Sequence, residues 1–168
     1  MLKRILLVAV MMAVPVTALA EEITVKVAAT AMPWYLKKNK ALPYGKGDGT
    51  KPAIAELKLE PGLVLHMTAI GSTTTVAGGG GFPPSGQADF IADDHLGGSG
   101  MPFPSMYIGH GFYPVHLNEL VAVFTDGGGK VVKSPFPIGT EMTITVPEGA
   151  QKLQFGINDD IFADNSGE

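Results

Sequence analysis

The chain has 168 residues with 12 basic and 16 acidic side chains, no cysteine and a formal net charge of −4. Without cysteine, no disulfide, thiolate metal site or cysteine nucleophile can form. The acidic balance argues against nucleic acid and anionic membrane surfaces as partners, because both are bound through an excess of positive charge.

The first twenty residues have the pattern of an export signal. Two basic residues precede an apolar run from Ile5 to Val16, and Ala18-Leu19-Ala20 supplies a cleavage site with small residues. The run is too short to span a membrane. We therefore expect residues 1–20 to be a signal peptide cleaved after Ala20, and the protein to be periplasmic or secreted.

The remaining chain, residues 21–168, is long enough for a single domain with a sizeable core. It keeps ten lysines, no arginine and sixteen acids, a net charge of −6. Short runs of alternating or β-branched residues between turn residues predict strands. In chain order these runs are Ile23–Val27, Ile54–Leu59, Leu63–Ala69, Leu120–Phe124, Met142–Val146 and Leu153–Ile157. They predict an all-β fold, an antiparallel β-sandwich of the jelly-roll type or close to it.

Glycine and proline mark the connections between these strands. Glu60-Pro61-Gly62 and Pro147-Glu148-Gly149 predict tight turns, and Asp126–Gly129 predicts a hairpin loop leading into Lys130–Val132. Two stretches without clear periodicity, at about 34–52 and 78–114, are expected to be long loops. Loops of this length are usually functional or disordered, and in a sandwich they gather at one end of the sheets.

The last twelve residues carry the strongest functional signal. Ile157–Glu168 contains four carboxylates, two carboxamides and one hydroxyl directly after a predicted strand. Oxygen ligands at this density, without cysteine or histidine, suit calcium better than zinc or copper. The segment is not an EF-hand, because it lacks the glycine and the final glutamate of that loop. The alternative is a solvated acidic tail.

Several short motifs, taken in order, resemble the calcium-dependent galactose-binding lectins of the PA-IL type, which are galactose-binding-domain-like β-sandwiches. The resemblance runs from about Pro52 to Gly167 with a large insertion in the middle. The motifs are Pro61-Gly62, Thr68-Ala69-Ile70-Gly71, Phe136-Pro137-Ile138-Gly139, Gly156-Ile157-Asn158-Asp159 and Asp164-Asn165-Ser166-Gly167. The last two are the most specific.

This resemblance implies a calcium ion that is shared by the protein and a sugar. Asp159 would be the main carboxylate ligand, with Asp164 and Asn165 as further side-chain ligands. Thr75 and Phe162 would each give a backbone carbonyl. Two vicinal hydroxyls of a galactose-type sugar would bind the same ion, which leaves Asp159 and Asn165 next to the sugar.

The chain also departs from the family pattern. Its loop is two residues shorter and more acidic, and the sugar-contacting residues of the middle loop have no clear counterpart. Asp93-Asp94-His95 is the nearest candidate, with Asp94 and His95 as sugar contacts. Because the sequence stops at Glu168, we expect either a truncated sequence or a sandwich that lacks its last strand. Assembly into a homo-oligomer stays open.

Two other non-enzymatic readings remain. In the first, calcium orders the loop of a structural or adhesion domain and no sugar binds. In the second, the protein is a periplasmic copper binder, since histidine and thioether groups hold copper. The candidate copper ligands are His66, Met67, Met101, Met106, His110 and His116. Against copper, His66 and Met67 should point to opposite faces of one strand.

No enzymatic function is expected. The chain has neither a Gly-x-Ser-x-Gly nor a His-Glu-x-x-His motif. A carboxylate pair for glycoside hydrolysis could be drawn from Asp89, Asp93 and Asp94, but three acids on a loop are more typical of a solvated surface. Trp34 could stack on a sugar ring, although a role in capping the core is the favoured interpretation.

Overall fold

The regular structure consists of antiparallel strands with almost no helix, in a computed structural model that describes residues 22–168. The expected all-β fold is therefore confirmed, whereas the expected signal peptide, residues 1–20, lies outside the described residues. The elements are β1 (Ala53–Ile54), β2 (Val64–Thr68), β3 (Thr73–Thr74), the 3-10 helices η1 (Pro104–Tyr107) and η2 (His110–Phe112), β4 (Leu120–Thr125), β5 (Phe136–Pro137), β6 (Glu141–Thr145), β7 (Lys152–Ile157) and β8 (Ser166–Gly167). No helix within residues 22–168 is long and apolar enough to cross a membrane.

The four-stranded sheet, in the order β1-β7-β4-β5, is covered on both faces. Its central strands β4 and β7 pair from Leu120↔Ile157 to Thr125↔Lys152. Five consecutive residues of β4, Val121 to Thr125, are buried, so this strand shows no alternation between buried and exposed positions. Ala122 and Phe124 face one core, and Val121 and Val123 face the opposite side. Strands covered on both faces read as continuous apolar runs.

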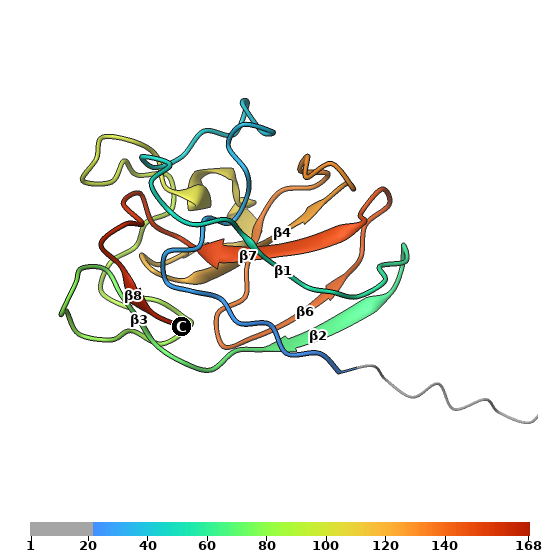
Figure 1. Ribbon diagram of the computed structural model, residues 1–168, viewed down its shortest axis with the longest axis horizontal. Helices are drawn as coiled ribbons and strands as arrows, with labels where there is room; N and C mark the ends of the chain where they lie inside the picture. Colours follow the sequence, from blue (N-terminus) through green and yellow to red (C-terminus); the bar gives the residue numbers. More distant parts are fainter. Residues whose placement is uncertain (1–21) are drawn as a thin grey trace, which may run out of the picture.

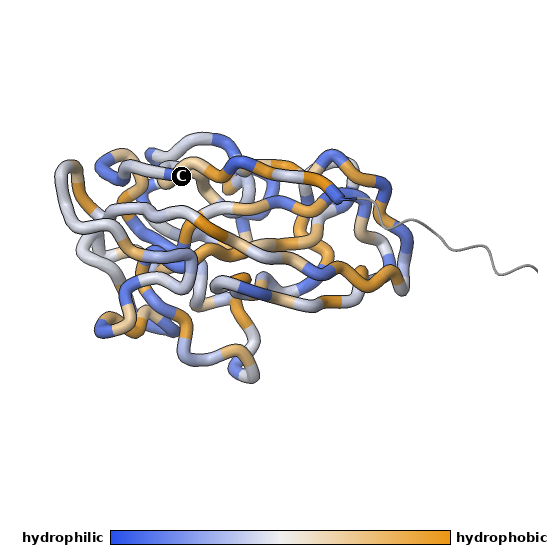
Figure 2. The backbone as a smooth tube through the Cα atoms, turned by 90° about the horizontal axis from the view of Figure 1, so that it is seen from below, coloured by the Kyte–Doolittle hydropathy of each residue, from blue (hydrophilic) through white to orange (hydrophobic). Residues whose placement is uncertain are grey.

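One face of this sheet packs against the separate pair β2–β6 (Figure 1). Leu65 and Met67 of β2 and Ile144 of β6 contact the same core as Phe124. The residues between them along the strands are exposed, which gives both strands an alternating burial pattern. Figure 2 shows long apolar stretches along the chain, interrupted by hydrophilic turns. The alternating burial of β2 and β6 means that each strand has one buried face and one face exposed to solvent.

The other face of the sheet is covered by loops, drawn in light blue and yellow in Figure 1. Trp34, Tyr44 and Phe162 are fully buried there against Val123. The Trp34 indole donates to the Leu42 carbonyl at 3.0 Å, and the Tyr44 hydroxyl donates to the Trp34 carbonyl at 2.6 Å. Trp34 thus caps a core, as favoured above, and does not offer its ring to a sugar.

The segment before Trp34 contacts the last residues of the described chain. Ala29 donates its backbone N–H to the Gly167 carbonyl at 2.9 Å, and Lys26 forms an exposed ion pair with Glu168 at 3.0 Å. Val25 and Val27 pack against the core that contains Phe124. Ile23–Val27 is nevertheless not a strand, so that prediction is wrong. The side chains of Val25 and Val27 reach the core, although the backbone of this segment pairs with no strand among the described residues.

Three further predictions need correction. Of the predicted strand Ile54–Leu59, only Ile54 lies in a strand, although Leu57 and Leu59 pack against the core. Lys130–Val132 contributes one isolated bridge, Val131↔Thr125, rather than a hairpin strand. The short strands β3 and β8 pair with each other and were not predicted. The remaining predicted strands agree with the observed ones to within two residues.

The double-sided core predicts a large penalty for truncation at its centre. Phe124→Ala should lower the free energy of unfolding by about 3–5 kcal/mol, because a buried ring is lost and the surrounding β-sheet collapses only partly into the space. Urea unfolding followed by circular dichroism measures this change. Ile70→Ala is the control, since Ile70 is 95% exposed and should change stability by about 0.5 kcal/mol or less. Equal effects of the two substitutions would contradict the packing described here.

Candidate functional site

The acidic C-terminal loop lies buried against the rest of the protein. β7 ends at Ile157, and the side chains that follow at 158–160, 162 and 165 are all buried. Asp159 is only 4% exposed and Asn165 only 7%. A solvated acidic tail is therefore the wrong interpretation for the start and middle of this segment, although its last residues, Ser166 to Glu168, are exposed.

Asp159 is the central carboxylate of the loop. Its Oδ1 accepts hydrogen bonds from the backbone N–H groups of Asp160 at 2.7 Å and Ile161 at 3.3 Å. Its Oδ2 accepts one from the Asn165 side-chain amide at 2.9 Å. Burial raises the pKa of Asp159 to about 6 in spite of these hydrogen bonds. A carboxylate has about four lone-pair positions, so one acceptor position remains.

Asn165 and Asp164 present oxygen atoms that have no hydrogen-bond donor. The Asn165 amide nitrogen donates to Asp159 and also to the Ala29 carbonyl at 3.2 Å, which fixes the orientation of the group. Asn165 Oδ1 and Asp164 Oδ1 are both buried and have no partner among the described residues. Buried acceptors normally find a donor, a water or an ion. These oxygens are therefore suited to a bound cation.

Of the two backbone positions expected to act as ligands, Phe162 is hydrogen-bonded to Asn165 and Thr75 directly follows β3. β3 pairs with β8 through Thr73↔Gly167 and Thr74↔Ser166. Thr75 follows β3 directly in the chain and Asn165 directly precedes β8, so both residues adjoin this strand pair. Phe162 donates its N–H to Asp48 at 3.0 Å and accepts from the Asn165 N–H at 3.2 Å. Hydrogen bonds thus join Asn165 to Asp159 and to Phe162, whereas the grouping of all five predicted ligands stays a prediction.

Asp160 joins the C-terminal loop to the long middle loop, a role that the sequence did not reveal. Its Oδ2 accepts from the Ser99 backbone N–H at 2.7 Å, and its backbone carbonyl accepts from Lys46 at 2.9 Å. The backbone of Gly97 lies directly against the Asp160 carboxylate, leaving no space for a side chain. Asp160 is therefore used to hold loops together.

The expected sugar contacts, Asp94 and His95, lie on the exposed part of this middle loop. Their side chains are 3.8 Å apart, and both are largely accessible to solvent. They precede Gly97, the residue that touches Asp160, by two and three positions. No hydrogen bond among the described residues links either side chain to Asp159 or Asn165. They lie on the loop that reaches the site through Gly97 and Ser99.

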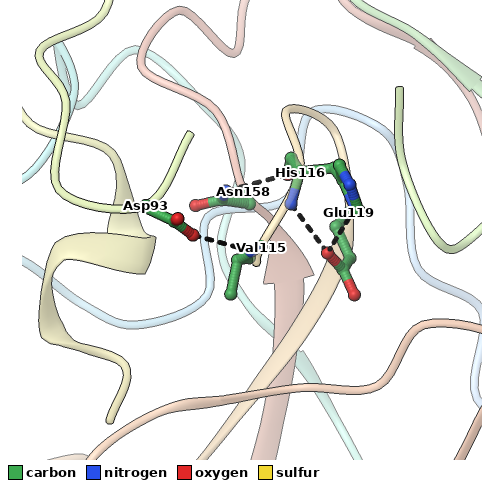
Figure 3. Close-up of polar contacts among 5 residues, drawn as sticks. All are labelled: Asp93, Val115, His116, Glu119 and Asn158. Carbon is green, nitrogen blue, oxygen red and sulfur yellow. Dashed lines mark hydrogen bonds and ion pairs between the residues drawn. The ribbon is translucent and has the colours of Figure 1, made fainter. Parts of the chain in front are cut away.

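A third buried acid, Glu119, lies at the same end of the sheet as Asp159 and Asp160 (Figure 3). Its Oε2 accepts from the His116 backbone N–H at 2.8 Å and lies 3.6 Å from His116 Nδ1. Asn158 braces this turn by donating to the His116 carbonyl at 2.9 Å. Burial raises the pKa of Glu119 to about 7, the His116 N–H lowers it in part, and the charge of Asp93 raises it further.

Two of the copper candidates, His66 and Met67, point to opposite sides of β2. His66 is exposed and hydrogen-bonds Thr143 at 2.9 Å, whereas Met67 packs against the core, so their predicted opposite orientation is confirmed. Within residues 22–168, no three His, Cys, Asp or Glu side chains come together in a way that could hold a metal. A metal at the C-terminal loop therefore needs amide and carbonyl oxygens besides Asp159 and Asp164.

Comparison of the chain with protein-family models, with curated proteins and with solved structures found no match. The resemblance to PA-IL-type lectins stays a prediction that rests on the sequence motifs. The site has to be argued from its own geometry.

The raised pKa values of Glu119 and Asp159 predict that the free energy of unfolding falls as pH rises when no metal is present. Their ordinary pKa values are 4.5 for Glu119 and 3.8 for Asp159, and folding raises them to about 7 and about 6. The folded state therefore holds protons that the unfolded state has released, and this advantage is lost as pH rises through the folded values. In chelator, the free energy of unfolding should drop by an amount on the order of 3 kcal/mol between pH 5 and pH 8.

Urea unfolding at several pH values measures this dependence. Glu119→Gln should remove more than half of it, because the amide keeps an acceptor for the His116 N–H but does not ionise. A stability that is flat or rises with pH in this range would contradict the buried, uncompensated state of the two acids.

The contact between Gly97 and Asp160 predicts a difference between neighbouring glycines. Gly97→Ala should lower the free energy of unfolding by about 1–3 kcal/mol, because its methyl group would displace a carboxylate held by Ser99. Gly98→Ala is the matched control, since a Cβ there meets nothing within 4 Å. Chemical denaturation of both variants provides the measurement, and equal stabilities would mean that the middle loop does not rest on Asp160.

Proposed function

We propose that the C-terminal loop binds a calcium ion and that the protein recognises a galactose-type carbohydrate through this ion. The observation that carries the proposal is the buried, unpartnered oxygen of Asn165 beside the Asp159 carboxylate, with a second unpartnered oxygen on Asp164. Two buried acceptors without donors, on Asn165 and Asp164, are costly in a protein interior, and a cation offsets that cost.

Calcium fits this set of donors better than other metals. Asp159, Asp164 and Asn165 would hold it through side-chain oxygens, and Thr75 and Phe162 through backbone carbonyls. All five are oxygen donors, which suit calcium and magnesium, whereas copper and zinc favour nitrogen and sulfur. Calcium accepts about six to eight oxygens, so five protein donors leave room for hydroxyl groups from outside. The ion would supply positive charge to the loop and a binding position for a sugar.

The finer description of the fold belongs to the same proposal. We infer a β-sandwich of the galactose-binding-domain-like type, in which the β2–β6 pair forms part of the second layer. The shared core between this pair and the four-stranded sheet supports that inference. Export to the periplasm or beyond, inferred from the pattern of residues 1–20, gives the loop access to millimolar calcium and to external glycans.

Calcium binding is tested by thermal unfolding in millimolar calcium against excess chelator. At a calcium concentration about a hundredfold above Kd, binding adds roughly 2.7 kcal/mol and raises the melting temperature by roughly 5–10 °C. Magnesium should not reproduce the shift. Asp159→Asn should reduce it strongly, whereas Asp89→Asn, on an exposed part of the middle loop, should leave it unchanged. A folded protein with no calcium response would contradict the proposal.

Sugar recognition needs a separate test, because a calcium site that only orders the loop gives the same thermal shift. The protein should be retained on a galactose resin in calcium and released by chelator. His95→Ala should weaken retention while leaving the calcium-dependent melting shift intact, since His95 is exposed and forms no hydrogen bond to the metal loop. Calcium binding without retention on a panel of sugar resins would favour the structural or adhesion role instead.

A further inference from the structure

Asn118 is a buried residue next to the candidate site that no part of the sequence analysis singled out. It is 1% exposed and lies in the turn just before β4. Its φ of 64° places it in the left-handed region, where asparagine is one of the few side-chain-bearing residues that occur regularly. A buried polar residue in an uncommon backbone conformation calls for a physical reason.

The turn places Asn118 beside the first residues of the C-terminal loop. The β4–β7 ladder ends at Leu120↔Ile157, and beyond it Asn158 donates to the Glu119 carbonyl at 2.8 Å. Asn118 in turn donates its backbone N–H to the Asn158 carbonyl, also at 2.8 Å. That carbonyl belongs to the peptide group linking Asn158 to Asp159, so Asn118 contacts the backbone from which the main carboxylate of the site extends.

The Asn118 side chain extends toward the strands that carry the other ligands. Its amide nitrogen donates to Thr73 Oγ1 at 2.6 Å, and Thr73 pairs with Gly167. Thr75 and Asn165 are each two residues away in the chain, just outside these two strands. The remaining amide atom, Oδ1, is buried and has no hydrogen-bond partner among the described residues. It joins the unpartnered oxygens of Asp164 and Asn165.

We propose that Asn118 Oδ1 is a further oxygen ligand of the metal bound by the C-terminal loop. The inference rests on the calcium site proposed above and adds a ligand from outside the loop. A neutral amide oxygen is an ordinary calcium ligand and adds no negative charge to an already acidic site. With this ligand the protein supplies six oxygens, and fewer positions remain for hydroxyl groups or water.

The surroundings hold Asn118 in place before any metal arrives. The carbonyl of Leu117 accepts from Gln87 at 2.9 Å, and the N–H of Leu120 donates to Pro84 at 2.9 Å. Gly86 lies against the backbone of this turn so closely that a Cβ there would overlap it. Because neighbouring segments hold this turn in place, the Asn118 amide loses little conformational entropy when it binds a metal.

The test counts water molecules on a bound europium ion, which replaces calcium at oxygen sites and reports coordinated water through its luminescence lifetimes in H2O and D2O. Asn118→Gly removes the amide and tolerates the positive φ, so the fold should persist. We expect about one additional coordinated water in this variant, because water takes the vacated position. Calcium affinity, measured by calorimetry, should fall roughly tenfold.

Thr73→Val is the control for a merely structural role. It removes the hydrogen bond to the Asn118 amide nitrogen while leaving the oxygen, so the water count should stay at the wild-type value. A weaker affinity of Asn118→Gly without an added water would overturn the ligand role. Unchanged affinity and water count would overturn it as well and leave the calcium site standing. Failure of the wild-type protein to bind either ion would overturn the calcium proposal itself.

Discussion

Strands β4 and β7 lie side by side over six residues each, buried on both faces, and the rest of the protein is arranged around them. Their backbone groups have no access to water, so an unpaired group there would be costly. β1 and β5 extend the sheet at its edges, β2 and β6 cover one face, and the Trp34 loop covers the other. A shift of one residue in this ladder would turn every side chain to the wrong core.

The polar chemistry gathers where the ladder stops. Beyond Leu120 and Ile157, the two chains continue as a tight turn and as the C-terminal loop, which stay in contact through backbone hydrogen bonds. Both Glu119 and Asp159 are buried there, and burial raises the pKa of each. The two acids are in a similar situation, since this end of the sheet removes both carboxylates from water. His116 Nδ1 lies 3.6 Å from the Glu119 carboxylate, whereas Asp159 has only neutral hydrogen-bond donors around it. A divalent cation at the loop would compensate this directly.

The sequence predicted features that depend on neighbouring residues and missed contacts between distant segments. β2 and β6 were predicted because one solvated face leaves a period of two. β4 was predicted from a continuous apolar run, and β7 from apolar residues that alternate with Gln154 and Gly156. Ile23–Val27 was wrongly predicted as a strand, since alternation records which side chains reach a core and not whether the backbone has a partner. The oxygen-rich loop was visible in composition, but its burial was not. Asn118 and Asp160 act on segments more than 40 positions away, and no local pattern reports such contacts.

The meeting of the N-terminal and C-terminal segments has a kinetic consequence. Ala29 bonds the Gly167 backbone, and Lys26 pairs with a residue 142 positions further along the chain. The β2–β6 and β3–β8 pairs also join distant parts of the sequence. Closing loops of this length costs conformational entropy before the contacts stabilise the protein. Folding should therefore be slow for a domain of this size. The segment at Lys26 and Ala29 cannot complete its contacts until Gly167 and Glu168 have been synthesised.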